Sequence, residues 1–264
     1  MPLSTRLYKT EAIILRQRKL GEADRILTLY TPALGKIEAK AKGVRKTTSR
    51  LSGHLQPLNR CVLQLARGHT ADVITGVETL ESFRNLREDL DRLSRGLYAA
   101  ELTDRMTVER VHSFPIFRLM LETLTRLDTG ASGDITLRYF EMRLLDQSGF
   151  RPELERCVGC TRELEPADHF FAPAAGGVVC RGCVPGLAGP RLLTLNGLKL
   201  LRLIQRGSYN DLARVRVPAG LADEVERHLR GYIITVLERE VNSAAFIERL
   251  RRDGARATPI QSRV

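Results

Sequence analysis

Four cysteines constrain the fold of this chain more than any other feature. They form two pairs, Cys157-x2-Cys160 and Cys180-x2-Cys183, with 19 residues between the pairs. This spacing is typical of two knuckles that together hold one tetrahedral Zn²⁺. Because four thiolates leave no coordination position for water or substrate, the pattern predicts a single structural zinc ion and not metal catalysis.

Two other interpretations of these cysteines are less consistent with the sequence. A pair of disulfides would suit a secreted chain, but the first residues show no apolar segment or cleavage site of a signal peptide. A redox-active CxxC pair is expected at the start of a helix, whereas the linking segment is rich in proline and glycine and predicts loop or short strands. Since four sulfurs complete the metal shell, we expect His169 in this segment to be a surface residue. The fifth cysteine, Cys61, lies in a strand-like run and is expected to be a buried apolar residue.

The size and composition are those of a globular protein with more than one domain. The chain has 264 residues, of which 43% are hydrophobic and 28% charged. No apolar run approaches the ~18 residues that a membrane-spanning helix needs. We therefore expect a cytoplasmic protein, associated with the nucleoid if its partner is DNA, with no membrane partner.

Positive charge is concentrated at the N-terminal end. The net charge is +11, and residues 1–80 contribute 14 basic against 6 acidic side chains. Six of the 7 lysines fall within the first 46 residues. A solvated surface is the usual explanation of a charge run, but few acids lie near these residues. The distribution therefore favours a polyanionic partner, most simply nucleic acid.

Residues 5–80 have the pattern of short strands. Runs rich in Val, Ile, Leu and Thr are separated by glycine and proline, and we expect strands at 8–15, 26–31, 35–42, 61–66 and 71–80. Five short strands in about eighty residues suit a small closed barrel such as the OB-fold, which binds nucleic acid along one face.

From Glu81 onward the apolar period is helical. Leu86, Leu90, Leu93 and Leu97 predict one buried helix face, and further helices are expected from Ser113, over about 134–148, from Thr194 and from Pro218. The fold class is therefore α+β and multidomain. We divide the chain into an OB-fold domain (1–80), a helical domain in two parts (81–150 and 191–250), an inserted four-cysteine zinc module (151–190) and a basic tail (251–264).

The basic residues of the predicted barrel are the candidate nucleic-acid contacts. The longest loop begins Lys42-Gly43-Val44-Arg45-Lys46, and its glycine lets the backbone approach phosphate. Only two aromatic rings, Tyr8 and Tyr30, occur in residues 1–80, so phosphate contact should dominate over base stacking. The predicted surface consists of Arg16, Arg18, Lys19, Arg25, Lys36, Lys40, Lys42, Arg45, Lys46 and Arg50.

Sequence motifs of catalysis are missing. The chain contains no GxxxxGK[ST] phosphate loop, no HExxH, no GxSxG and no HxE that would accompany the CxxC of a zinc deaminase. We therefore expect a binding protein and not an enzyme.

Several motifs resemble those of the bacterial RecO recombination-mediator family. They are Gly21-Glu22-Ala23-Asp24-Arg25, Gly35-Lys36, Ala41-Lys42-Gly43-Val44-Arg45-Lys46, Leu55-Gln56-Pro57, Phe140-Glu141-Met142-Arg143-Leu144-Leu145 and Gly149-Phe150-Arg151-Pro152. The resemblance covers most of the chain up to about Gly189. It implies an N-terminal OB-fold, a helical domain and a zinc module.

The resemblance also implies a role in recombinational DNA repair. Members bind and anneal single- and double-stranded DNA, partner RecR, contact single-strand-binding protein and help RecA to replace it on single strands. Some members lack the cysteines, which implies that the zinc is structural.

Three other functions stay open from the residues themselves. The chain could be a zinc-ribbon adaptor that scaffolds proteins and touches nucleic acid only incidentally, an enzyme with a dispersed site, or an RNA-binding translational factor. Replacement of Lys42, Arg45 and Lys46 separates the adaptor, whose DNA affinity would not change, from the DNA-binding protein.

Overall fold

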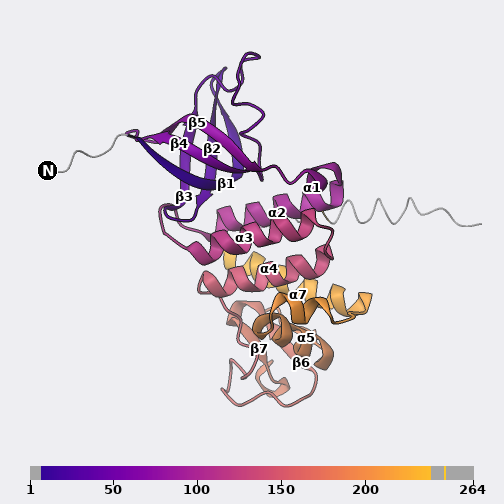
Figure 1. Cartoon of the computed structure of the whole chain (residues 1–264). Coiled ribbons are helices and arrows are strands. Elements are labelled where there is room, and N and C mark those ends of the chain that lie inside the picture. Colours follow the sequence, from indigo (N-terminus) through magenta and orange to yellow (C-terminus); the bar gives the residue numbers. More distant parts are fainter. Residues whose placement is uncertain (1–6, 239–246, 248–264) are drawn as a thin grey trace, which may run out of the picture. The chain divides into compact units, whose positions relative to one another are not determined.

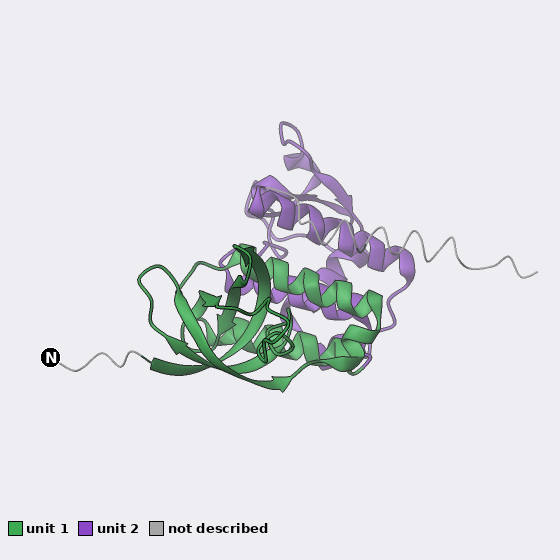
Figure 2. Ribbon diagram, turned by 90° about the horizontal axis from the view of Figure 1, so that it is seen from above, with its two compact units in different colours: residues 1–129, 241–264 green, residues 130–240 purple. Residues whose placement is uncertain are grey.

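A computed structural model describes residues 7–238 and residue 247 of the chain. The chain divides into two compact units, residues 1–129 with 241–264 and residues 130–240, shown in green and purple in Figure 2. The predicted basic tail, 251–264, lies outside the described residues. Among the residues that the structure describes, no helix combines the length and the apolar character needed to cross a membrane.

The first unit begins with a five-stranded closed barrel (Figure 1). Its strands follow the order β1-β2-β3-β5-β4, and the pairing of β3 with β5 is parallel while the other pairings are antiparallel. This is the OB-fold expected from the sequence. The strand bounds are β1 Leu7–Leu20, β2 Asp24–Thr31, β3 Gly35–Ala41, β4 Arg60–Ala66 and β5 Asp72–Glu81.

Buried and partly exposed residues alternate along β3, and the buried ones contribute to the barrel core. On β3 every second residue is buried, and Ile37, Ala39 and Ala41 face the interior together with Leu27 and Leu29 of β2. Cys61 is fully buried in the same core, as expected. β1 shifts its register between Ile14 and Arg16, where an irregularity bends the strand as barrel closure requires.

The turn between β2 and β3 depends on Gly35. Its φ is +64°, and a Cβ at this position would stand 2.7 Å from the carbonyl carbon of Val111 and still closer to its oxygen. The chain around Val111 lies along the edge of β3, where Arg110 N–H donates to the Lys36 carbonyl at 2.8 Å and Glu109 bridges to Lys36. Glycine is therefore needed both for the backbone conformation and for the close approach.

We predict that Gly35→Ala destabilises the first unit by more than the left-handed conformation alone explains. Gly21 is the matched control, because its φ is +59° but a Cβ there would meet nothing within 4 Å. Gly21→Ala should cost about 1–2 kcal/mol for the backbone alone, and Gly35→Ala should cost clearly more. Thermal unfolding followed by circular dichroism measures both. Equal losses in the two variants would show that the contact with Val111 contributes nothing.

Among the described residues of the first unit, three helices follow the barrel: α1 Arg84–Glu88, α2 Leu90–Met106 and α3 Phe114–Asp128. The prediction of one continuous helix through Leu86, Leu90, Leu93 and Leu97 is wrong. The chain is extended at Asp89, with φ −112° and ψ 117°, and Leu90 is 55% exposed. The buried face of α2 instead includes Gly96, Tyr98, Ala99 and Leu102. As expected, α3 starts after Ser113, and it buries Phe117, Met120, Leu124 and Leu127.

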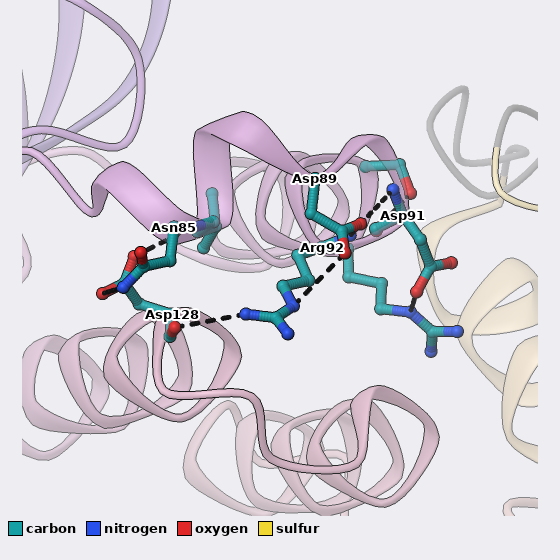
Figure 3. Close-up of polar contacts among 8 residues, drawn as sticks. Asn85, Asp89, Asp91, Arg92 and Asp128 are labelled. Carbon is teal, nitrogen blue, oxygen red and sulfur yellow. Dashed lines mark hydrogen bonds and ion pairs between the residues drawn. The ribbon is translucent and has the colours of Figure 1, made fainter.

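The Asp89 carboxylate explains the break between α1 and α2, and the Asp128 carboxylate caps the start of α1 (Figure 3). Asp89 caps α2 by accepting hydrogen bonds from the backbone N–H groups of Asp91 at 2.9 Å and Arg92 at 3.1 Å. Asp128, at the end of α3, accepts a hydrogen bond from the backbone N–H of Leu86 at 2.8 Å. Arg92 joins the two ends: its guanidinium pairs with Asp89 and donates to the Asp128 carbonyl.

The second unit combines helices with a small sheet. The helices are α4 Gly133–Gln147, α5 Leu195–Arg206, α6 Tyr209–Ala213 and α7 Ala219–Leu237; the sheet has the order β7-β6-β8, with β6 His169–Ala172, β7 Gly177–Val179 and β8 Arg191–Leu193. Thr194 caps α5 by accepting the Gly197 N–H at 3.0 Å, as its place in the sequence indicates. The sequence pattern did not predict α6, which starts with a capping box of Ser208 and Asp211.

The sheet packs on α7 through aromatic contacts. The Phe171 ring lies 5.6 Å from the rings of both His228 and Tyr232. His169 is buried, with 6% exposure, and its Nε2 lies 2.8 Å from the Glu165 carbonyl oxygen. The expectation that His169 is a surface residue is therefore wrong, because β6 turns this side chain inward and its backbone partner satisfies the ring nitrogen.

Candidate functional site

The predicted basic residues on the strands lie on two faces of the barrel wall. Arg18 pairs across β1 and β2 with Ile26, which in turn pairs with Lys40, so Arg18 and Lys40 share the outer face. Lys19 pairs with Arg25, and Arg25 pairs with the core residue Ala41. Lys19 and Arg25 therefore belong to the inward face, at the end of the strands where the barrel wall meets solvent.

The loop after β3 is tied to the turn between β1 and β2. The Gly43 N–H donates to Asp24 Oδ1 at 2.8 Å, and the Arg45 N–H donates to the Ala23 carbonyl at 2.9 Å. The Arg45 guanidinium donates to the Gly21 carbonyl at 2.9 Å. These contacts bring the loop, which we call the basic loop (residues 42–50), to the same end of the barrel as Lys19 and Arg25.

Three residues of the basic loop carry its available charge. Lys42, Lys46 and Arg50 are exposed, and no ion pair to them occurs within the described part of the chain. Exposed cations that form no ion pair are suited to phosphate, since no ion pair has to be broken before a contact forms. The basic loop is therefore the part of the predicted surface with the strongest physical case.

Lys36 and Arg16 are placed differently, beside α2. Lys36 Nζ pairs with Asp104 Oδ1 at 3.3 Å and also donates to the Asp104 carbonyl, and only 16% of the side chain is exposed. Arg16 pairs with the other oxygen of the same carboxylate at 3.4 Å but is 57% exposed. Because Lys36 already has a partner and little exposure, we leave it out of the proposed surface; Arg16 and Arg18, which pairs with Glu38, stay predictions.

Asp24 is a functional candidate that sequence reasoning missed. Lys40 Nζ lies 3.1 Å from its Oδ2, while Gly43 donates to its Oδ1. The Gly43 N–H and then Lys40 hold the pKa of Asp24 below its usual value. Its contacts are therefore present at neutral pH and are lost as the pH falls through the lowered pKa. The sequence alone did not single out Asp24, because its partner Gly43 lies 19 residues away in the chain.

The four cysteines come together in the second unit. Their sulfur atoms all lie within 4.8 Å of one another, and Cys160 Sγ stands 3.9 Å from Cys180 Sγ. A tetrahedral ion with bonds of ~2.3 Å places its sulfurs about 3.8 Å apart, so these residues fit one metal ion with four thiolate ligands.

Local backbone geometry builds the two knuckles. The Thr161 N–H donates to the Cys157 carbonyl at 2.8 Å with Thr161 at φ +61°, and the Cys183 N–H donates to the Cys180 carbonyl at 2.9 Å. A Cβ on Gly159 would stand 2.9 Å from the Cys183 Cβ, so only glycine fits between the knuckles.

The surroundings of the cluster favour the thiolate, the form that binds a metal, at Cys157 and Cys160. The Arg162 guanidinium donates to Cys160 Sγ at 3.4 Å and lowers the pKa of Cys160 to about 6. Burial opposes the ionisation of Cys157, but backbone N–H groups, first that of Cys180, outweigh it and lower its pKa. Cys183 has a raised pKa because it shares hydrogen bonds with the other sulfurs, so a bound cation is needed to hold four thiolates together.

The fold and the site define an α+β protein with an N-terminal OB-fold, a helical region and a four-cysteine cluster able to hold a metal ion. Two family models match it: Recombination protein O N terminal over residues 5–83 and Recombination protein O C terminal over residues 87–245. The chain therefore belongs to the RecO family of DNA repair proteins.

Curated relatives are similar in sequence to this chain along nearly its whole length. The DNA repair protein RecO of Dehalococcoides mccartyi strain BAV1 is 41% identical over 244 residues, which cover 92% of this chain and 96% of the relative. The corresponding protein of Roseiflexus sp. strain RS-1 is 40% identical, over 93% of this chain and 87% of its own. That of Symbiobacterium thermophilum is 36% identical, over 93% and 98%.

Proposed function

We propose that this protein is a DNA-binding recombination mediator. It binds single- and double-stranded DNA through the basic loop and the adjoining strand residues, and it anneals complementary strands. The observation that carries the proposal is the exposed basic loop, fastened to the end of an OB-fold in a member of the RecO family. The contacts are made to phosphate, so binding depends on salt and little on base sequence.

The proposed partners follow from the family. The protein acts with RecR, contacts single-strand-binding protein and thereby assists RecA to load on single strands in recombinational repair. It works in the cytoplasm at the nucleoid. It catalyses no covalent reaction: its contribution is to hold strands together, for which charge and exposure are sufficient.

We propose zinc as the ion of the four-cysteine cluster. Four thiolates in tetrahedral arrangement are the donor set that structural zinc prefers in proteins. The ion braces the knuckles and has no open coordination position. Metal analysis of the purified chain should find about one zinc per chain.

Strand annealing tests the function directly. Two complementary oligonucleotides, one labelled with a donor and one with an acceptor fluorophore, are coated with single-strand-binding protein and mixed with or without this chain. We expect energy transfer to rise much faster when the chain is present, and the rate to fall as salt is added. A chain that binds neither free nor coated DNA would instead be the zinc-ribbon adaptor, and turnover of the DNA in Mg²⁺ would identify an enzyme.

A further inference from the structure

The basic loop and the end of β3 before it carry a dense run of positive charge. Lys40, Lys42, Arg45 and Lys46 lie within seven consecutive residues, and Arg25 pairs with Ala41 on the neighbouring strand. Like charges on neighbouring residues repel one another, and salt weakens this repulsion beyond a Debye length of about 8–10 Å. An acid that contacts this run offsets part of the repulsion.

Asp24 supplies that counter-charge from the neighbouring hairpin. It is the first residue of β2 and pairs with Leu20, so its backbone belongs to the barrel and not to the loop. One carboxylate oxygen accepts the Gly43 N–H at 2.8 Å and the other lies 3.1 Å from Lys40 Nζ. Through the same carboxylate the last basic residue of β3 and the first turn of the loop are joined to a rigid strand.

Gly43 gives the loop the direction that this contact requires. Its φ is +64°, a left-handed conformation, and a Cβ there would come no closer than 3.8 Å to Lys46. Glycine is therefore present for its backbone conformation and not to avoid a clash. Immediately after this turn, Arg45 bonds through its backbone N–H and its guanidinium to Ala23 and Gly21, which continues the attachment along the hairpin.

We infer that Asp24 is a positioning residue for DNA binding, which presets the basic loop for phosphate although it places a negative charge on the binding surface. This inference rests on the proposed function. The inference goes beyond the proposed function because an acid at a DNA-binding surface would, by its charge alone, weaken DNA binding. A positioning role therefore predicts that removal of the Asp24 charge weakens DNA binding, whereas an effect of charge alone predicts that it strengthens DNA binding.

Asp24→Ala and Glu22→Ala form a matched pair for this test. Both variants remove one negative charge from the hairpin of β1 and β2. Asp24 contacts Gly43 and Lys40, whereas Glu22 is exposed. Affinity for a labelled single strand is measured by fluorescence anisotropy across a salt series. We expect Glu22→Ala to bind up to about fivefold more tightly, roughly the value of one phosphate contact near 0.15 M salt. We expect Asp24→Ala to bind several-fold more weakly than wild type.

A second readout separates positioning from a general loss of structure. In Asp24→Ala, hydrogen exchange should accelerate at the amides of Gly43 and Arg45 and stay unchanged at core amides of β2 and β3. If Asp24→Ala does not fold, the isosteric pair Asp24→Asn and Glu22→Gln replaces it, and Asp24→Asn should bind more weakly than Glu22→Gln. Equal gains in affinity in either pair overturn the inference.

Failure of the inference can be told from failure of the proposed function. The same titration includes a variant in which Lys42, Lys46 and Arg50 are alanine. If that variant binds as wild type does, the proposed surface is wrong. If it binds weakly while Asp24→Ala gains as much as Glu22→Ala, the surface is right and only the positioning role of Asp24 is refuted.

Discussion

Simultaneous replacement of Lys42, Lys46 and Arg50 by alanine is expected to lower DNA affinity about a hundredfold near 0.15 M salt. Each phosphate contact contributes a slope of about −0.9 on duplex and −0.7 on single strands to the plot of log K against log salt. Loss of three contacts should therefore reduce the slope by about 2.7 and 2.1 units respectively. Arg45 is kept in this variant because its guanidinium holds the loop to Gly21.

A control variant removes the same charge elsewhere. Lys199, Arg214 and Arg216 are exposed residues of the second unit, and their replacement by alanine also lowers the net charge by three. This variant should keep the wild-type slope and nearly the wild-type affinity. Similar losses in both variants would mean that overall charge, and not the basic loop, attracts DNA.

Removal of the metal ion is expected to unfold the knuckles without affecting DNA binding. Structural zinc in small finger peptides contributes about 10–16 kcal/mol of binding free energy that is also folding free energy. Residues 155–163 and 180–190 contain little buried apolar surface, apart from Cys157 itself. In a variant with Cys157→Ser and Cys180→Ser, hydrogen exchange should become fast over these two segments.

The neighbouring sheet provides an internal reference for this experiment. Phe171 keeps its contacts with His228 and Tyr232 on α7, so β6 should stay protected. Cys61→Ala is the control variant. Cys61 lies in the barrel core, so its replacement should not alter the zinc content. DNA affinity should change less than about twofold, since the basic loop belongs to the other unit. A large loss of DNA affinity would refute a purely bracing role of the metal.

Local patterns predicted the elements whose stabilisation is local. Glycine and proline between β-branched runs located the strands of the barrel, although β1 continues to Leu20 because Lys19 and Leu20 pair with the start of β2. Cap residues located the starts of α3 and α5. The break at Asp89 was missed because a leucine stripe of helical period continues through it, although the Asp89 side chain caps the start of α2.

The sequence located the positive charge of the proposed binding surface, but it did not show which cations are exposed and unpaired. Clustered lysines indicated a polyanion-binding barrel, yet Lys36 and Lys42 look alike in the sequence. The difference between them comes from Asp104, which lies 68 residues from Lys36 and faces it only after α2 has packed on β1. Asp24 became significant in the same way, through contacts that only barrel closure creates.

The amino-acid sequence alone located the candidate metal ligands, since two CxxC knuckles place four sulfurs by short-range geometry that the rest of the chain hardly alters. The sequence also predicted the barrel and its positive charge, because the alternation of apolar and polar residues and the composition are properties of contiguous residues. Tertiary packing decided which cations stay exposed and which are neutralised, because these ion pairs form between residues that are distant in the chain and meet only in the folded state. The same packing made Asp24 the fastening point of the basic loop.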